Sequence, residues 1–101
     1  MADLIKVFFS GIFVFNAIPH LVQGICGKRH MTPFSRKSSP TINVIWGWIN
    51  LLIGGCLFIN LDAEILAGST ITAFLLGGFL ISLILSMFWS NPNAKLPWHN
   101  N

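Results

Sequence analysis

The sequence predicts an all-α integral membrane bundle of three transmembrane helices, at residues 4–25, 41–61 and 69–89. Of the 101 residues, 53% are hydrophobic and only 9% are charged. Soluble domains carry roughly 25% charged residues, because they must cover their surface with polar groups. Each apolar run is also close to the roughly 20 residues that a helix needs to cross a bilayer. We therefore expect a single transmembrane domain over residues 1–101.

The first expected helix is apolar on all sides in its outer half and carries polar residues in its inner half. Its start has balanced charge and lacks a small-residue cleavage site, so we expect it to be retained rather than removed as a signal peptide. Asn16, His20 and Gln23 are spaced four and three apart, which places them on one helix face. Pro19 lies among them and frees the carbonyl of Phe15, which bends the helix.

The segment at residues 26–40 is expected to be a basic cytoplasmic loop. It holds four of the six basic residues of the chain: Lys28, Arg29, Arg36 and Lys37. Cytoplasmic loops of membrane proteins carry an excess of Lys and Arg, so we interpret these residues as topology determinants at the lipid headgroups and expect no nucleic-acid partner. Ser39 and Pro40 form a favourable N-cap and N1 pair for the second helix.

The second expected helix presents a face of small and amide residues at intervals of four, three and four. These residues are Asn43, Gly47, Asn50 and Gly54. The turn that follows contains Asp62 and Glu64 and no basic residue. With a basic first loop and an acidic second one, the predicted topology places the N-terminus outside and the C-terminus inside.

The third expected helix carries Ser69, Ala73 and Gly77 at four-residue steps, a spacing that lets another helix approach closely. Counted from the acidic turn, the Gly54-Gly55 pair of the second helix falls near the depth of residues 76–78, and packing within the chain or between protomers both stay open. The expected helix-packing residues are therefore Gly54, Gly55, Ala73 and Gly77. Residues 90–101 are predicted to be a cytoplasmic interfacial tail without a fold of its own.

The polar faces of the first two helices also coincide in depth. Counting inward from the basic loop at about 1.5 Å per residue places Gln23 level with Asn43, His20 level with Trp46 and Gly47, and Asn16 level with Asn50. Interhelical hydrogen bonds of this kind contribute about 0.6–2 kcal/mol each. The Asn50 amide is also a candidate donor to the carbonyl freed by Pro19. We call the whole set the polar ladder: Asn16, Pro19, His20, Gln23, Asn43, Gly47 and Asn50.

Two interpretations of the polar ladder remain open. It either fixes the first helix on the second, or it makes His20 a proton carrier, a metal or haem ligand, or a substrate contact, because ionisable residues inside a membrane are commonly functional. A second axial ligand for haem is not expected, since no other histidine is placed at the depth of His20. His30 and His99 are expected to be plain interfacial residues.

Other reactive groups predict no chemistry. Cys26 and Cys56 are expected at opposite membrane faces, so a disulfide is not predicted. Cys26 is interpreted as an inert thiol, with a reactive thiol beside Lys28 and Arg29 or a juxtamembrane acylation site as the alternatives. The histidines and Cys26 fit no zinc-binding spacing. Asp62 and Glu64 are expected on the side opposite the histidines, which leaves no carboxylate pair for acid–base work. We therefore predict no catalytic residue, no metal, no cofactor and no enzymatic activity.

One stretch of the sequence resembles a group of small bacterial three-span membrane proteins of about 100 residues with no assigned function. The resemblance covers residues 16–50 and rests on the pattern N-A-x-P-H, followed by G-x-x-G, T-P-F and S-S-P-x-x-N-x-x-W-G-x-x-N. It implies a multi-pass protein of the bacterial inner membrane. By size the chain is also similar to three-helix half-transporters that work as dimers, but it has Pro19-His20 where those carry Pro-Gln.

A bundle of three helices has little interior in which to enclose a ligand, so we expect function to need a second chain. The first hypothesis is a structural or interaction subunit, or an assembly factor, in a homo-oligomer or a larger membrane complex. The alternative is a small oligomeric transporter or channel with a polar midplane site around His20. A weaker alternative is an accessory redox subunit with His20 near a quinone or haem.

Overall fold

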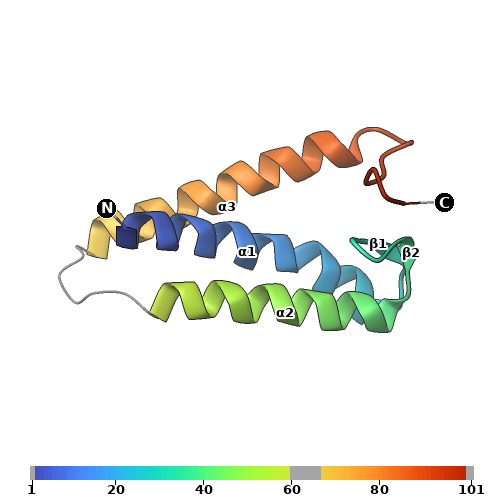
Figure 1. The fold of residues 1–101 in the computed structure, drawn as a ribbon, viewed down its shortest axis with the longest axis horizontal. Helices are drawn as coiled ribbons and strands as arrows, with labels where there is room; N and C mark the ends of the chain where they lie inside the picture. Colours follow the sequence, from blue (N-terminus) through green and yellow to red (C-terminus); the bar gives the residue numbers. More distant parts are fainter. Residues whose placement is uncertain (1, 60–66, 100–101) are drawn as a thin grey trace.

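The structure, a computed structural model, describes residues 2–59 and 67–99 and shows three long helices with a small hairpin at one end (Figure 1). The elements in chain order are α1 (Ala2–Ile25), β1 (His30–Thr32), β2 (Ser35–Ser38), α2 (Pro40–Ile59) and α3 (Ala67–Trp89). All three helices are long and apolar enough to cross a membrane. The predicted all-α membrane class is therefore confirmed, and the chain has the character of a multi-pass membrane protein. The predicted acidic turn, with Asp62 and Glu64, lies outside the described residues.

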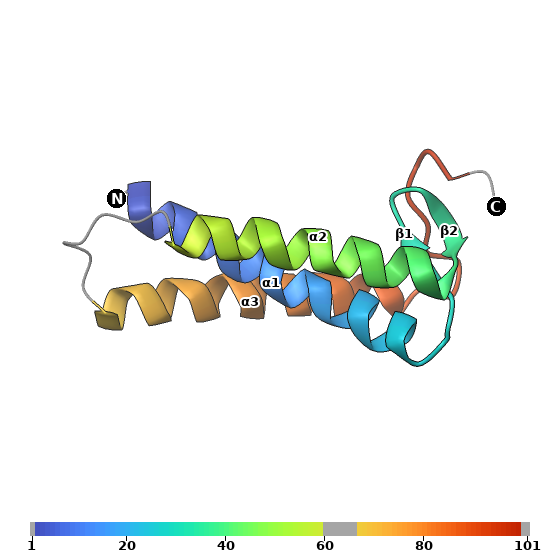
Figure 2. The ribbon, with the colours of Figure 1, turned by 90° about the horizontal axis from the view of Figure 1, so that it is seen from below.

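Helix α1 is the centre of the bundle. Both α2 and α3 pack along α1, while α2 and α3 make almost no contact with each other apart from the rings of Phe58 and Phe74. Two views at right angles show α1 between the other two helices, with the N- and C-terminal ends of the chain at opposite ends of the bundle (Figures 1 and 2). The fold is elongated, at 47 × 24 × 23 Å, a length that suits a bilayer with its headgroups.

Local signals account for the inner ends of α1 and α2. Gly27 adopts a left-handed conformation with φ of 74°, and the amides of Gly27 and Lys28 donate to the carbonyls of Gly24 and Gln23. This is a Schellman arrangement, in which glycine is favoured because a Cβ would be strained. At the start of α2, the hydroxyl of Ser39 accepts a hydrogen bond from the amide of Ile42, as expected of an N-cap.

The basic segment is not a plain loop, as the sequence interpretation had it, but an antiparallel β-hairpin. Strands β1 and β2 pair Thr32 with Ser35 across a two-residue turn and His30 with Ser38, with a register shift between the two pairs. The hydroxyls of Thr32 and Ser38 lie 2.6 Å apart, and Thr32 also accepts from the amide of Phe34 at 3.2 Å. Short polar side chains thus provide hydrogen bonds within the tight turn. The two strands are too short for an alternating apolar and polar pattern to predict the hairpin from the sequence.

The C-terminal tail is also ordered on the hairpin, which corrects the expectation of a tail without a fold of its own. The indole nitrogen of Trp98 donates to the carbonyl of Pro33 at 2.6 Å, and Nε2 of His99 donates to the carbonyl of Thr32 at 2.8 Å. Arg36 donates from Nε to the carbonyl of Ala94. These partners are about 60 residues apart in sequence, so only the approach of α3 to the hairpin brings them together.

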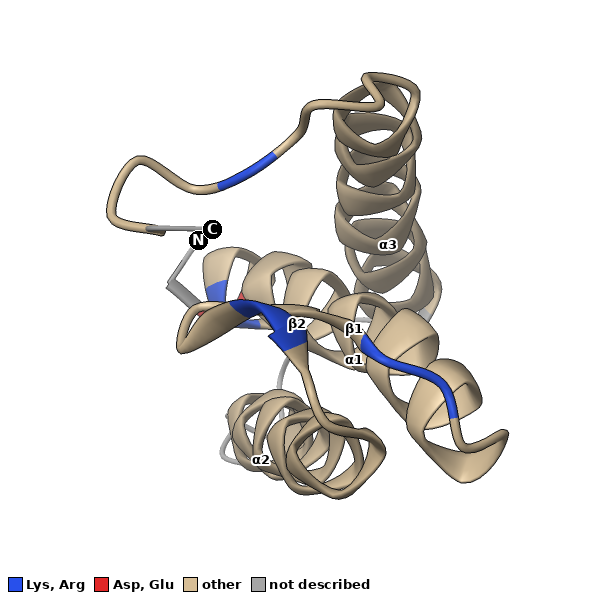
Figure 3. Ribbon diagram, turned by 90° about the vertical axis from the view of Figure 1, so that its right-hand side faces the viewer, with Lys and Arg blue, Asp and Glu red and all other residues tan. Residues whose placement is uncertain are grey.

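Basic residues gather at the hairpin end of the bundle (Figure 3). The two arginines have structural partners: Arg29 donates to the carbonyl of Lys37 at 2.9 Å, and Arg36 holds the tail. Lys28, Lys37 and Lys95 are exposed. The lysines therefore remain open to solvent, whereas the arginines fix the backbone of the hairpin and the tail.

Candidate functional site

Asn43, at the start of α2, is the centre of a buried hydrogen-bond network. Its side chain has 0% exposure. Its amide nitrogen donates to the carbonyls of His30 at 2.9 Å and of Ser38 and Ser39 at 3.1 Å. One side chain thereby joins the hairpin to α2, which satisfies backbone groups that would be costly to bury alone.

His20 completes this network from α1. Its Nδ1 lies 2.8 Å from Oδ1 of Asn43, and both side chains are buried. Because the Asn43 nitrogen already faces three carbonyls, its oxygen is the acceptor, and Nδ1 of His20 carries the proton. In a neutral imidazole this leaves Nε2 of His20 as an unprotonated acceptor, and no described residue donates to it. The network thus fixes the tautomer of His20.

One turn deeper, Asn16 and Asn50 form the second rung of the polar ladder. The amide of Asn16 donates to Oδ1 of Asn50 at 3.1 Å, as the matched depths predicted. The Asn50 amide donates to the carbonyl of Trp46 at 2.9 Å, so it is not the donor to the Phe15 carbonyl that the sequence interpretation proposed. Asn50 turns back on its own helix because an amide at this position can reach the carbonyl one turn earlier.

The expected partnership between Gln23 and Asn43 is wrong. The residue of α1 that faces the start of α2 is Gly24, where a Cβ would collide with the Pro40 carbonyl and with Val44. Gln23 consequently lies to the side of the interface. His20, rather than Gln23, is the residue of α1 that bonds to Asn43. The depth count was sound, but it could not show which residue of the turn faces inward.

Glycines set the distance between α1 and each of its neighbours. A Cβ on Gly47 would meet Leu21, and one on Gly54 would meet Val14 and the carbonyl of Ser10. The hydroxyl of Ser10 donates to the Gly54 carbonyl at 2.6 Å, a buried contact that the sequence interpretation did not include. These residues hold α2 directly against α1.

Helix α3 packs on α1 in a similar way. A Cβ on Gly77 would collide with the Phe8 carbonyl, and one on Gly11 would collide with the Phe74 carbonyl. Gly54 and Gly77 therefore both face α1, so Gly54 is used for close helix packing within the chain but not against the third helix. A Cβ on Gly55 would meet nothing, while Ala73 is half-buried on α3. Both glycines face α1 because α1 lies between the other two helices, an arrangement that the pattern of apolar residues does not reveal.

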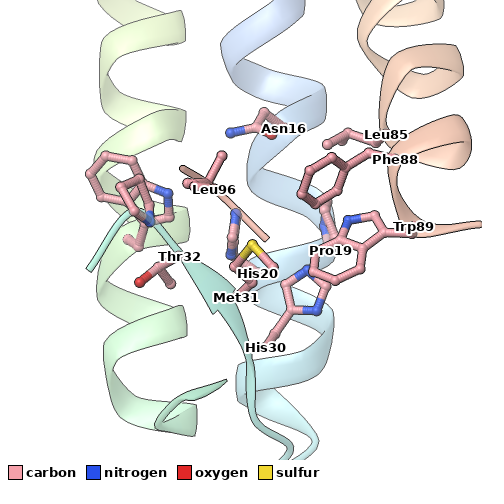
Figure 4. A pocket seen from close by; sticks show the side chains of 12 residues that line it. Asn16, Pro19, His20, His30, Met31, Thr32, Leu85, Phe88, Trp89 and Leu96 are labelled. Atoms are coloured by element: carbon pink, nitrogen blue, oxygen red, sulfur yellow. The ribbon is translucent and has the colours of Figure 1, made fainter. Parts of the chain in front are cut away.

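A cavity of about 170 Å³ opens beside the polar ladder, between α1, the hairpin and the last turns of α3 (Figure 4). Asn16, Pro19 and His20 line it from α1, and Leu96 of the tail lies over it. The remaining lining residues come from the hairpin, α2 and α3: His30, Met31, Thr32, Pro33, Trp46, Leu85, Phe88 and Trp89.

His30 brings a second imidazole to this cavity, contrary to the expectation of a plain interfacial residue. Its ring centroid lies 5.2 Å from that of His20 and 4.5 Å from that of Trp89. Burial, and then the neighbouring His20, lower the pKa of His30 from 6.5 to about 4. Nε2 of His30 is buried and has no hydrogen-bond partner among the described residues. The hairpin turns His30 back toward α1, which spacing along the sequence could not predict.

Other candidate groups lie apart from the cavity. Cys26 and Cys56 are exposed free thiols. His99 is committed to the hairpin backbone. Over residues 2–59 and 67–99, no three His, Cys, Asp or Glu side chains are grouped closely enough to hold a metal ion.

Comparison of the chain with protein-family models, curated proteins and solved structures gives no match. The site is therefore interpreted from its own geometry, and the resemblance noted over residues 16–50 stays a prediction.

Proposed function

We propose that this protein is a structural or interaction subunit of a membrane assembly, either a homo-oligomer or a larger complex, in the bacterial inner membrane. The hairpin end would face the cytoplasm, because its basic residues follow the positive-inside bias. The observation that carries the proposal is that the side chains of the polar ladder form hydrogen bonds within the chain. Asn16, Asn43 and Asn50 all bond within the chain, and they fix α1, the hairpin and α2 as one rigid unit.

A rigid unit of this kind suits a partner-binding role, since little ordering remains to be paid for on association. Helix α3 packs chiefly on α1, and most of its large side chains are exposed. Leu75, Leu76, Phe79 and Leu83 are each between 45% and 63% exposed. Lipid covers such a face in a monomer, and a second membrane helix covers it in an assembly.

The alternative is a small oligomeric transporter or channel, and one observation favours it. Asn16, Pro19 and His20 line a cavity beside the proline position, where transporters commonly place a site. The hydrogen bonds described above join α1, α2 and the hairpin to one another, however, and do not line a polar route along the bundle. The subunit role is therefore preferred.

The test is the size of the protein in the membrane. We expect native mass spectrometry of the mildly solubilised protein to show a homo-oligomer or a complex with another membrane chain. Cross-linking in intact membranes through cysteines introduced at Phe79 and at Leu83, in a background with Cys26 and Cys56 replaced by serine, should trap the same species. A cysteine at Lys28 is the control, because that site lies at the hairpin end. A monomer in both measurements would contradict the proposal.

A further inference from the structure

The cavity beside His20 and His30 has the size and walls of a site for a single ring. Its volume of about 170 Å³ exceeds the roughly 150 Å³ of an engineered apolar cavity that binds benzene. Phe88 and Trp89 supply aromatic walls, and Leu85 and Leu96 supply aliphatic ones. Lys, Arg, Asp and Glu are all missing from the residues that line it. The cavity therefore favours a neutral ring over an ion or a phosphate headgroup.

One ring nitrogen gives this apolar cavity its hydrogen-bonding character. Nδ1 of His20 donates to Asn43, so Nε2 of His20 is an acceptor, and His20 lines the cavity. Nε2 of His30, in contrast, is buried away from the open space and is not offered to a ligand. A ligand that donates a hydroxyl proton to His20 would satisfy the accepting nitrogen.

The position of the cavity defines how such a ligand would arrive. Its walls come from α1 and α3, which are both candidate membrane spans, and the tail lies over the hairpin side (Figure 4). Trp89, at the end of α3, lines the cavity and is also 39% exposed, so this wall reaches the outer surface of the bundle. A ring with an apolar chain can therefore occupy the cavity while its chain remains in the bilayer.

We propose that this cavity binds the ring of a lipid-soluble quinol, with one ring hydroxyl donating to Nε2 of His20 and with the ring packed against Phe88 and Trp89. A quinol combines a flat neutral ring, hydroxyl donors and an apolar chain, which are the three properties that the cavity and its position select. The proposal concerns binding alone. It is independent of the subunit role, because a monomer could hold the ring equally well.

The test uses three probes of nearly the same shape: decylubiquinol under anaerobic conditions, its oxidised quinone, and the di-O-methyl ether of the quinol. We expect calorimetric titration of the full-length protein in detergent to show the quinol binding about tenfold more tightly than the ether, the loss typical of one buried hydrogen bond. The quinone, which cannot donate to His20, should also bind more weakly than the quinol. Equal binding of all three would overturn the proposal.

Matched variants separate the cavity from partition into the micelle. Leu85→Trp fills the cavity and should abolish quinol binding, whereas Leu83→Trp adds the same bulk to an exposed position of α3 and should leave the affinity within about twofold. Thermal melting checks that both variants fold. Should Leu85→Trp misfold, Leu96→Trp fills the cavity from the tail instead and should likewise abolish quinol binding. Unchanged binding in a folded cavity variant, or a co-purifying phospholipid that quinol does not displace, would contradict the proposal.

Discussion

The two interfaces of α1 are built differently. Toward α2 the contact combines glycines with an internal hydrogen-bond network, in which Asn43 serves α1 and the hairpin together. Toward α3 the described contact rests on close backbone approach at Gly11 and Gly77. Lipid provides no hydrophobic force between helices, so close packing and hydrogen bonds must hold both interfaces. Directional bonds also fix a register, which close packing alone specifies less strongly.

This difference explains where the cavity lies. The first half of α3 carries small residues that bring it against α1, and the second half carries Leu85, Phe88 and Trp89. These large side chains hold the end of α3 away from α1, and Figure 1 shows the two helices diverging toward the hairpin. The hairpin and the tail then enclose the space between them. We thus expect a ligand to bind on the side of α1 that faces α3, where no hydrogen-bond network like that of Asn43 is described between the helices.

The largest effect is expected at the centre of the polar network. Asn43→Ala removes the side-chain partner of the His20 proton and of the His30 and Ser38 carbonyls, while the Ser39 carbonyl keeps the backbone amide of residue 43. Since each unpaired buried group costs about 1–3 kcal/mol, we expect a loss of about 3 kcal/mol in the free energy of unfolding. Thermal and denaturant unfolding in micelles measure it, with the exposed Thr41→Ala as the control. A loss similar to the control would show that the network does not hold α2.

A smaller effect is expected at the glycine interface. Gly77→Leu places a side chain against the Phe8 backbone, whereas Gly55→Leu places the same side chain in open space. Overpacking typically costs about 1–3 kcal/mol, so we expect about 2 kcal/mol for the first and little for the second. Cysteine cross-linking between α1 and α3 should weaken in Gly77→Leu alone. If the two variants behave alike, α3 is not held by close packing at this point.

The smallest change in the free energy of unfolding is expected at His30, and it is a gain rather than a loss. His30→Phe removes a buried nitrogen that has no partner, so we expect a gain of about 1 kcal/mol near neutral pH. The thermal midpoint in the absence of added ligand measures this change. A clear loss of stability would mean that His30 has a bonding role within the chain.

The same residue carries a pH dependence. The pKa of His30 is about 4 in the folded protein, against about 6.5 for an unfolded histidine. The unfolded chain therefore binds the proton first, so protonation of His30 does not affect the free energy of unfolding above pH 6.5 and lowers it as the pH falls from 6.5 toward 4. Melting curves across this interval should show a smaller slope for His30→Phe than for the wild type, and identical slopes would contradict the shift.

The sequence by itself determined the three spans, the basic character of one end and the existence of a polar face on each of the first two helices. It could do so because spans and faces depend on residues near one another in the chain, through hydropathy and a period of 3.6. The bond between Asn16 and Asn50 was predictable for the same reason. Two antiparallel helices joined by a short segment keep a simple relation between position and depth.

The tertiary structure alone decided that α1 is central, that His20 bonds to Asn43, and that His30 and the tail return to enclose a cavity. These features depend on which residue of a turn faces a neighbour and on contacts across more than 50 residues. Hydropathy does not encode either, because the same apolar surface can pack against lipid or against protein. The sequence therefore predicted one part of the candidate site, His20, and the fold added the other part, His30 and the tail.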